Sequence, residues 1–519
     1  MLDSNTLNET SWDVVISGTG LPQSLLALAL SKSGLKVLHV DKNAYYGGPD
    51  AAFSLQEAEE WVSEVNQASN SMPFESASIW KPALQEGEQD SLSSSRSYTL
   101  SLSPHLIYSR SNLIPTLVSS KVYRQLEFQA VGSWWVYSSK PEEDSDPSGS
   151  VARVLRVPSS REDVFADDTM SMKSKRSLMK ILRYMLQQEQ DDSNETDDSV
   201  PDIPFWDFLQ TEFQVPPGLF DALISLSVSL QSPVTIPAKD AISKIKRHLT
   251  SMGVFGSGFG AVINKWGGGA ELAQVACRAC AVGGGVYALG KEIQTIQIDP
   301  GGESETQLQI RFTDHETARC KFLVGSAWDL PQEVRPKPTT PLSKISRTIA
   351  IVNSPLEALF PPTAENGPIP AGAVVYVPNA ETTTPIYLLI HSSDTGECPV
   401  GQSVIYGYVS VSMDIGRGAL EQAVTNVLTS TDPRAKVIWS VSFSQSGQLN
   451  EKVTPPSNAI SSINIDGADG RVFSFPIPNL DLAFDDDVIE QVRHVWDAVL
   501  STEADFLVFK DQEGFTDDE

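Results

Sequence analysis

Cysteine is scarce in this chain, with four residues in 519. Four thiols are too few for a disulfide framework, so we expect a reducing compartment and, by default, the cytosol. Long apolar runs are lacking as well. The longest one near the N-terminus, Leu25 to Leu30, has no basic stretch before it and is far shorter than the roughly 20 residues of a membrane helix. We therefore expect neither a membrane span nor a secretion signal.

Basic residues are few relative to acidic ones. The chain has 38 Lys and Arg against 66 Asp and Glu, which gives a formal net charge of −28. Nucleic-acid binding depends mainly on contacts of Lys and Arg with phosphates, so this balance argues against a nucleic-acid partner. A partner with basic patches is one interpretation of the acidity. The other is that the charge only maintains solubility, because much of it lies in expected linkers.

Apolar residues make up 40% of the chain, which is enough for a large core, and the length predicts two to four domains. The chain opens with a strand at 13–17, a Gly turn, an apolar helix through Leu30 and a strand at 36–40, which is typical of a βαβ unit. Residues 56–98 are rich in Ser, Gln and Glu, and we expect an irregular insertion there with at most one helix. Two acidic stretches, 141–149 and 187–198, are expected to be solvated loops.

A helical subdomain is expected over residues 160–230. Leu178, Ile181, Leu182 and Met185 recur at i, i+3, i+4 and i+7, which is one stripe of an amphipathic helix. Residues 226–230 fit both a helix and the two-residue period of a strand. Further helical segments are expected at 205–209, 220–230 and 241–249.

The last third of the chain is β-rich, interrupted by a helix at 420–428 and closed by another after Asp485. The pattern predicts an α/β fold in which residues 1–130 together with 231–519 form a large domain with a mixed sheet, beside the smaller helical subdomain. The expected strands are 292–298, 307–312, 321–324, 347–352, 373–377, 386–391 and 404–411.

One turn has the form of a dinucleotide site. Gly18 and Gly20 follow a strand and open a helix, and Asp41 ends the next strand, close to the spacing at which an acid meets a ribose hydroxyl. The third glycine of the motif is replaced by Gln23, preceded by Pro22. Because Gln is much larger, a dinucleotide fits poorly, and we expect a retained turn without a cofactor. Flavin binding is the alternative.

Here the sequence becomes recognisable. The run Asp13-Val-Val-Ile-Ser-Gly18-Thr-Gly20-Leu-Pro-Gln and the later run Lys36-Val-Leu-His-Val-Asp41-Lys-Asn-Ala-Tyr45-Tyr46-Gly47-Gly48 resemble the Rab GDP-dissociation inhibitor and Rab escort superfamily. That resemblance implies an FAD/NAD(P)-binding-like fold, similar to flavin-dependent monooxygenases but without the cofactor. The stretches 157–165 and 170–182 look like the escort branch, and the acidic insertions make the chain longer than the compact inhibitors. The inhibitor branch remains the alternative.

The resemblance implies a non-catalytic adaptor. An escort protein binds a newly made, GDP-bound Rab GTPase and presents it to the catalytic Rab geranylgeranyltransferase heterodimer. It then keeps the geranylgeranyl lipid on the Rab covered until delivery, with transient membrane association. Two alternatives stay open, namely an inhibitor that recycles prenylated Rabs and a flavin-dependent oxidoreductase.

The resemblance also implies a Rab-binding platform. Glu271 and Arg278 are seven residues apart, so on a helix they share a face; without the resemblance, a solvated helix face is the other interpretation. The chain departs from the family in the Gly-rich stretch 253–260 and at Ala270 and Ala273, which puts the local loop geometry in doubt, and Ala288 replaces a larger apolar residue. The platform residues implied are Tyr46, Glu271, Gln274, Arg278, Val286 and Ala288.

The prenyl group is expected in the helical subdomain, with Leu178, Ile181, Leu182 and Met185 as a candidate wall. A stripe at this spacing is also typical of ordinary core, and the methionines at 170, 172, 179 and 185 are adaptable enough to pack around a lipid. Cys277 and Cys280 have redox-motif spacing, but no second pair accompanies them, so we expect buried thiols and no metal. The six histidines are scattered, and no catalytic site is expected.

Overall fold

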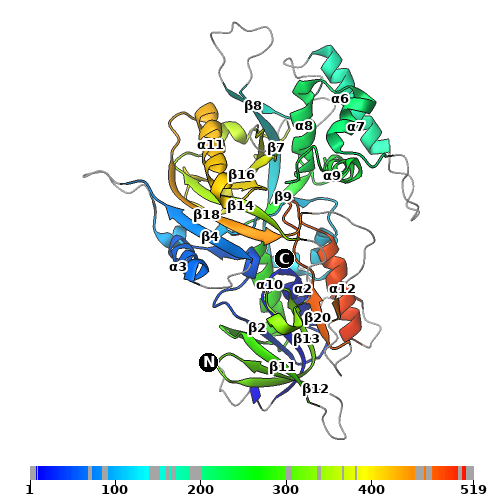
Figure 1. The fold of residues 1–519 in the computed structure, drawn as a ribbon, viewed down its shortest axis with the longest axis vertical. Helices are drawn as coiled ribbons and strands as arrows, with labels where there is room; N and C mark the ends of the chain where they lie inside the picture. Colours follow the sequence, from blue (N-terminus) through cyan, green and yellow to red (C-terminus); the bar gives the residue numbers. More distant parts are fainter. Residues whose placement is uncertain are drawn as a thin grey trace, which may run out of the picture.

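The computed structural model describes residues 7–8, 10–67, 73–83, 92–139, 152–158, 164, 171–187, 200–299, 307–335, 341–364, 367–379, 383–449, 461–462, 470–500 and 505–509. One large sheet lies toward one end of the long axis, and a second large sheet and a group of helices lie side by side toward the other (Figure 1). The helices lie at one end, and the sheet that contains the first strand lies at the other. Among the described residues, no helix is both long and apolar enough to span a membrane.

The first sheet is built around the predicted βαβ unit. β1 (Ser11–Ser17) and β2 (Val37–Asp41) pair in parallel, and α2 (Leu21–Leu30) connects them. The sheet has eight strands, in the order β10-β2-β1-β13-β12-β11, with β20 beside β13 and β19 beside β20. The remaining bounds are β10 (Val286–Leu289), β11 (Ile293–Asp299), β12 (Gln307–Phe312), β13 (Thr317–Ser326), β19 (Ser461–Ser462) and β20 (Val472–Phe475).

Three helices share one core with this sheet. They are α2, α10 (Gly269–Val282) and α12 (Asp487–Val499), and their apolar side chains form a single buried cluster with residues of β1, β13 and β20. Strands of a parallel sheet are typically buried on both faces, as the fully buried β2 is. The α/β prediction is therefore confirmed for this end of the molecule.

The second sheet is larger and mostly antiparallel. It has ten strands in the order β4-β18-β14-β17-β16-β15-β7-β9-β6, with β8 beside β7. α11 (Met413–Thr431) packs on it through a second core. Its strands are β4 (Phe74–Trp80), β6 (Ile107–Tyr108), β7 (Phe128–Ser138), β8 (Arg153–Arg156), β9 (Ala261–Asn264), β14 (Ser343–Val352), β15 (Gly372–Val377), β16 (Ile386–Ser392), β17 (Ser403–Val409) and β18 (Val437–Gly447).

The insertion predicted at 56–98 is more regular than expected. It contains the one expected helix, α3 (Leu55–Gln67), but also β4, which pairs with β18 at the edge of the larger sheet. Trp61 and Phe74 pack edge-on against each other and against Phe443 of β18, and these aromatic contacts anchor the insertion. The acidic stretches 141–149 and 188–198 and the tail 510–519 lie outside the described residues.

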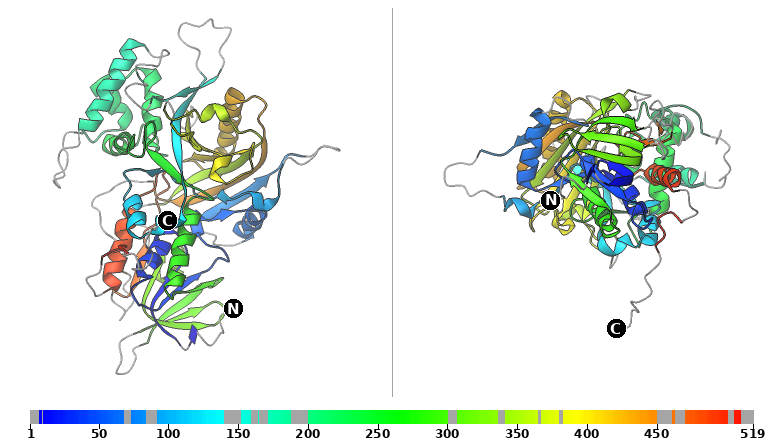
Figure 2. Two further views of the ribbon diagram at one scale, coloured as in Figure 1. Left: turned by 180° about the vertical axis from the view of Figure 1, so that it is seen from behind. Right: turned by 90° about the horizontal axis from the view of Figure 1, so that it is seen from below.

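Helices α6 (Met172–Gln187), α7 (Phe205–Phe213), α8 (Pro217–Ser227) and α9 (Ala238–Ser251) form the helical group. Both views of the ribbon place it beside β7 at one end of the molecule (Figure 2). The ambiguous residues 226–230 contain no strand, because α8 ends at Ser227 and Val228 takes a left-handed conformation with φ of 44°. In the structure the helical group therefore extends to Ser251.

Candidate functional site

The acidic residue of the dinucleotide-like turn is bonded by its own chain. One carboxylate oxygen of Asp41 accepts hydrogen bonds from the Thr19 amide (2.7 Å) and the Thr19 hydroxyl (2.6 Å). The other accepts from the amide and the side chain of Asn43, at 2.7 and 2.9 Å. Burial and the nearby Asp329 carboxylate raise the pKa of Asp41 to about 6. With both oxygens engaged by local groups, this carboxylate is not presented to a ribose.

Gln23 occupies the space that a third glycine leaves open. Its side-chain nitrogen donates to the Asp329 carboxylate at 2.8 Å. Both side chains close over Gly18, where an added Cβ would lie 2.3 Å from Asp329 and 2.9 Å from Gln23. Gly18 also has φ of 89°, so the turn retains glycine for its backbone conformation.

A carboxylate of the chain already lies at the N-terminus of α2. Asp50 accepts a hydrogen bond from the Leu21 amide at 3.3 Å, and its other oxygen lies 3.4 Å from Nε2 of His105. A pyrophosphate would need this positive end of the helix dipole and would meet two buried or half-buried carboxylates, Asp50 and Asp329. The residues present therefore do not fit a flavin dinucleotide.

The turn instead positions the neighbouring loop. The Gly47 amide donates to the Thr19 hydroxyl at 2.9 Å, which continues the hydrogen-bonded chain from Asp41 through Thr19 into the loop that carries Tyr46. The Tyr46 ring lies 6.2 Å from that of Tyr287 on β10, and partial burial raises the pKa of Tyr46. The structure thus brings this loop against β10.

Helix α10 supplies the polar part of the predicted platform. Glu271 is half-buried, whereas Gln274 and Arg278 are exposed. The three lie at i, i+3 and i+7 of one helix and share a face, as predicted. Burial raises the pKa of Glu271, and the positive charge of Arg278 opposes that rise. The two charged groups therefore influence each other electrostatically.

Strand β10 lies beside this surface but contributes only one of its side chains, Tyr287, to the face that α10 covers. Val286 and Ala288 pair in register with Leu38 and Val40 of β2 and are half-buried. The structure thus brings together the Tyr46 loop and α10, from two separate parts of the sequence, whereas Val286 and Ala288 pack with Leu38 and Val40 on the face of the sheet opposite to α10. We call the surface of Tyr46, Glu271, Gln274 and Arg278 the platform. Tyr287, whose ring lies beside that of Tyr46 in the loop, is not among the predicted platform residues. Tyr287 alternates with Val286 and Ala288 along the strand, so its side chain points to the other face, toward α10.

The Gly-rich departure from the family lies between α9 and β9. Gly258 has φ of +84°, and a Cβ there would approach the carbonyl oxygen of Thr363 to 1.9 Å. The loop presents Val254 and Phe255 with 46% and 45% of their surface exposed. Glycine at 258 is therefore required by both backbone conformation and space. Ala270 and Ala273, the other departures, are buried in the helix core.

The candidate prenyl wall faces a closed core. Leu178, Ile181 and Met185 are buried, with Leu182 partly buried against them, and they pack with apolar residues of α7, α8 and α9. Met172 is exposed and Met179 half-buried, while Met170 lies outside the described residues. The helix and its stripe are as predicted, and a lipid-binding role for the stripe stays a prediction.

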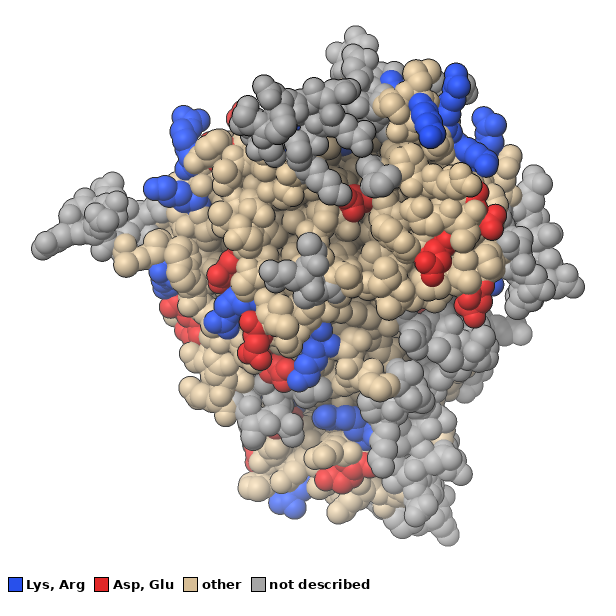
Figure 3. Space-filling model, turned by 45° about the horizontal axis from the view of Figure 1, so that its top comes forward, with Lys and Arg blue, Asp and Glu red and all other residues tan. Residues whose placement is uncertain are grey.

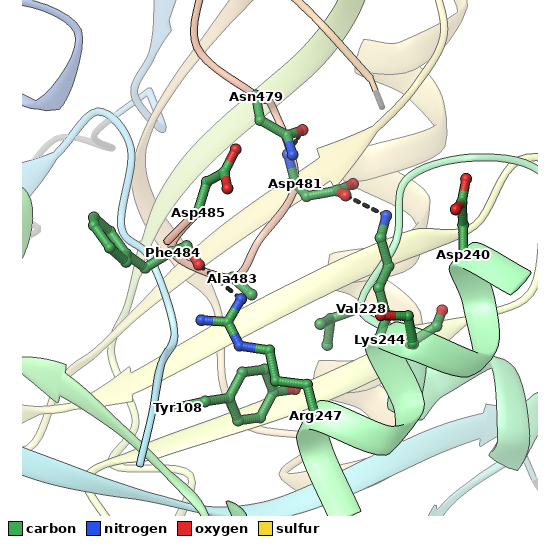
Figure 4. Close-up of a pocket in the computed structure, with 12 residues that line it drawn as sticks. Tyr108, Val228, Asp240, Lys244, Arg247, Asn479, Asp481, Ala483, Phe484 and Asp485 are labelled. Atoms are coloured by element: carbon green, nitrogen blue, oxygen red, sulfur yellow. Dashed lines mark hydrogen bonds and ion pairs between the residues drawn. The ribbon is translucent and has the colours of Figure 1, made fainter. Parts of the chain in front are cut away.

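A cavity of about 140 Å³ lies between the helical group and the segment 479–485 that precedes α12 (Figure 4). Lys244 of α9 forms an ion pair with Asp481, whose side chain is 7% exposed. Arg247, one turn further on, binds Asp486 at 3.0 Å and donates to the carbonyl of Phe484 at 2.9 Å. These charge-assisted bonds connect the helical group to the segment that leads into α12.

Cys277 and Cys280 are buried free thiols, as predicted. Burial raises the pKa of both thiol groups, in the case of Cys280 to about 11, so neither is an activated thiolate at neutral pH. Within the described ranges, no group of three or more His, Cys, Asp or Glu is placed to hold a metal ion.

The chain belongs to the GDP dissociation inhibitor family, whose model matches residues 7–365. Among curated relatives, it is 29% identical over 430 residues to "Rab proteins geranylgeranyltransferase component A" of Candida albicans, and 32% identical over 282 residues to the protein of that name from Saccharomyces cerevisiae. These matches cover 80% and 54% of this chain, but 62% and 43% of the relatives. The chain thus spans about half the length of these two relatives. "Rab escort protein 1" of Arabidopsis thaliana is 25% identical, with 96% of this chain and 94% of that protein covered.

Solved structures give the same fold. Rab GDI from Plasmodium falciparum superposes with a TM-score of 0.64 at 18% identity, covering 96% of this chain and 99% of that one. An oxidoreductase from Methanosarcina mazei superposes with a TM-score of 0.56 at 14% identity, covering 93% and 100%. The predicted fold class, an inhibitor-like fold related to that of oxidoreductases, is confirmed.

Proposed function

We propose that this protein acts as a Rab escort protein. It binds newly made Rab GTPases in their GDP form and presents them to the catalytic Rab geranylgeranyltransferase heterodimer, as a non-catalytic component. It then covers the geranylgeranyl lipid of the product and carries it through the cytosol to a membrane. Relatives named component A of this transferase or Rab escort protein, which match over most of the chain, favour this function over recycling by an inhibitor.

The observation that carries the proposal is the platform. The turn that would hold a cofactor is filled by Gln23 and Asp329, and its hydrogen bonds instead hold the Tyr46 loop beside α10 and β10. The resulting surface combines a half-exposed aromatic ring with an acid and a base. Aromatic and arginine side chains of this kind dominate the free energy of many protein interfaces.

The helical group supports the lipid-covering step. Each methylene removed from water contributes about 0.8 kcal/mol, so a geranylgeranyl chain requires an apolar cover in the cytosol. The core beneath α6 is apolar and contains the adaptable Met185. We propose that the lipid enters there by displacing α6 side chains, with Leu178, Ile181 and Leu182 among its contacts.

The decisive experiment is reconstituted transfer. Full-length Rab in the GDP form, geranylgeranyl diphosphate and the purified catalytic heterodimer are combined with and without this protein. We expect transfer only when the protein is present. Equal transfer without it contradicts the escort function, and extraction of prenylated Rab from membranes without support of transfer identifies an inhibitor instead.

The platform is tested by a double variant, Glu271→Ala with Arg278→Ala. We expect weaker binding of GDP-bound Rab by about 1 to 3 kcal/mol, as for interface hot spots, measured by calorimetric titration. Arg417→Ala with Glu421→Ala is the matched control, because it removes an exposed acid and base from α11 on the other sheet. Unchanged affinity of the first variant would exclude these residues from the Rab site.

A further inference from the structure

Helix α6 concentrates positive charge in a strongly acidic chain. Its 16 residues include five Lys and Arg and no Asp or Glu, whereas the whole chain has a net charge of −28. Lys175 is buried, and the other four are exposed. Their spacing of three, four and three residues places them on one face of the helix. We call this face the basic stripe; it consists of Lys173, Arg176, Lys180 and Arg183.

The basic stripe faces away from the core. The opposite side of α6 carries Leu178, Ile181 and Met185, which are buried in the main hydrophobic cluster. The Lys180 ammonium lies 5.4 Å from the centroid of the Phe213 ring. The methylenes of this side chain can therefore pack on the protein while the residue stays exposed. The helix is therefore fixed by its apolar side with its cations directed outward.

Apolar side chains are exposed beside these cations. Met172 at the start of α6 has 58% of its surface exposed and Leu186 near its end 38%. Strand β8, at the same end of the molecule, also carries exposed Arg156 and Leu155, the latter 42% exposed, and these two side chains point to opposite faces of the strand. Cations mixed with exposed apolar side chains are typical of a surface that lies in a lipid headgroup region.

The position of α6 suits contact with an extended surface. Two opposite views place α6 and β8 at the same end of the long axis (Figures 1 and 2). With that end turned forward, Figure 3 shows basic side chains gathered at the upper right, where α6 lies.

We propose that the basic stripe of α6 docks the protein on membranes rich in anionic phospholipids. Lys and Arg near such a surface gain electrostatic attraction within a Debye length, and the exposed Met172 and Leu186 of the same helix enter the headgroup layer. The proposal rests on the proposed function for its purpose, because the buried side of the same helix is the candidate prenyl wall. Docking through α6 brings the covered lipid next to the bilayer that receives it.

The test uses the full chain without any Rab, so that it is independent of the escort function. Protein is floated with vesicles of phosphatidylcholine alone and with vesicles containing about a third phosphatidylserine, at low and high salt. We expect binding to the anionic vesicles and its loss at high salt. Each cation contributes about fivefold, so replacing all four stripe residues by Gln lowers the partition coefficient more than about a hundredfold.

The matched control replaces four exposed cations outside α6 by Gln and changes the net charge equally. We expect less than about a threefold loss for the control, since these residues lie on other elements. Equal losses in both variants, or no binding of the unmodified protein to anionic vesicles at low salt, would overturn the proposal. So would a stripe variant that binds vesicles normally but loses affinity for the transferase, because the stripe would then dock a protein. The control residues are Lys36, Arg319, Arg417 and Arg434.

Failure of this proposal is distinguishable from failure of the escort function. A stripe variant that still binds GDP-bound Rab and supports transfer, but not vesicle binding, separates the two surfaces. If the unmodified protein binds vesicles but no Rab, the docking surface stands and the proposed function does not.

Discussion

The buried imidazole of His248 makes the stability of the protein depend on pH. His248 is 1% exposed, with the Tyr108 hydroxyl 3.4 Å from its Nδ1 and the Trp134 ring centroid at 4.5 Å. The guanidinium of the neighbouring Arg247 lies over the Tyr108 ring, 5.3 Å from its centroid. Burial lowers the pKa of His248 from 6.5 to about 4. The folded pKa is thus below the unfolded one, so the unfolding free energy falls as the pH falls from about 6.5 towards 4.

The size of this effect follows from the pKa shift. Between pH 6.5 and 5 the unfolded chain binds a proton that the folded His248 does not, and at about 1.4 kcal/mol per unit the cost is about 2 kcal/mol. His248→Phe removes this contribution. We expect the loss of unfolding free energy between pH 7 and 5, measured by urea denaturation, to be about 2 kcal/mol smaller in the variant than in the unmodified protein.

Tyr108→Phe provides the control. It removes the hydroxyl beside the imidazole but leaves His248 buried, and burial is the cause of the shift. Its pH dependence should therefore match that of the unmodified protein. The reasoning is refuted if His248→Phe loses as much stability as the unmodified protein between pH 7 and 5.

Three further predictions concern particular side chains. Lys244→Met leaves Asp481 buried without its cation and should lower the unfolding free energy by about 3 kcal/mol. Adding Asp481→Asn to this variant should restore most of the lost free energy. A double-mutant cycle measured by thermal unfolding would contradict the prediction if the effects of the two substitutions simply added. Gly258→Ala should lower the unfolding free energy by more than about 2 kcal/mol, because a Cβ at this position meets a backbone carbonyl. Gly253 has a similar φ but open space around it, so Gly253→Ala should lower the unfolding free energy by only about 1 kcal/mol. Equal shifts in melting temperature for the two variants would argue against a steric cause. Gln23→Gly should stay colourless after incubation with FAD, since two carboxylates still fill the site, and a flavin absorbance band would show that Gln23 alone excludes it.

Much of the fold could be predicted because its elements have clear periodicities. The βαβ opening and the strand segments from β11 to β17 follow from apolar runs and their boundaries. β18 was missed although Trp439, Val441 and Phe443 alternate, since Ser440, Ser442 and Ser444 between them made the stretch look polar. In the structure these serines lie within the sheet, each paired with β14 on one side and β4 on the other.

The platform was predictable only in part. Helical periodicity places Glu271 and Arg278 on one face, and the family resemblance adds Tyr46. The carboxylate of Asp50 at the N-terminus of α2 and the contact of Gln23 with Asp329 depend on tertiary structure, because the partners are 29 and 306 residues apart. No local pattern indicates such contacts.

The hydrogen-bonded chain from Asp41 through Thr19 to Gly47 has a consequence for protein engineering. In a cofactor enzyme, the acid at the end of the second strand is free to bind its ligand. Here the Asp41 carboxylate binds the Thr19 hydroxyl, and that hydroxyl in turn holds the Tyr46 loop through the Gly47 amide. Restoring a flavin would require that carboxylate to release Thr19, and the loop would lose its attachment at the same time. Cofactor binding and attachment of the Tyr46 loop therefore require the same side chain, Asp41, and an engineered variant can have one of the two properties but not both.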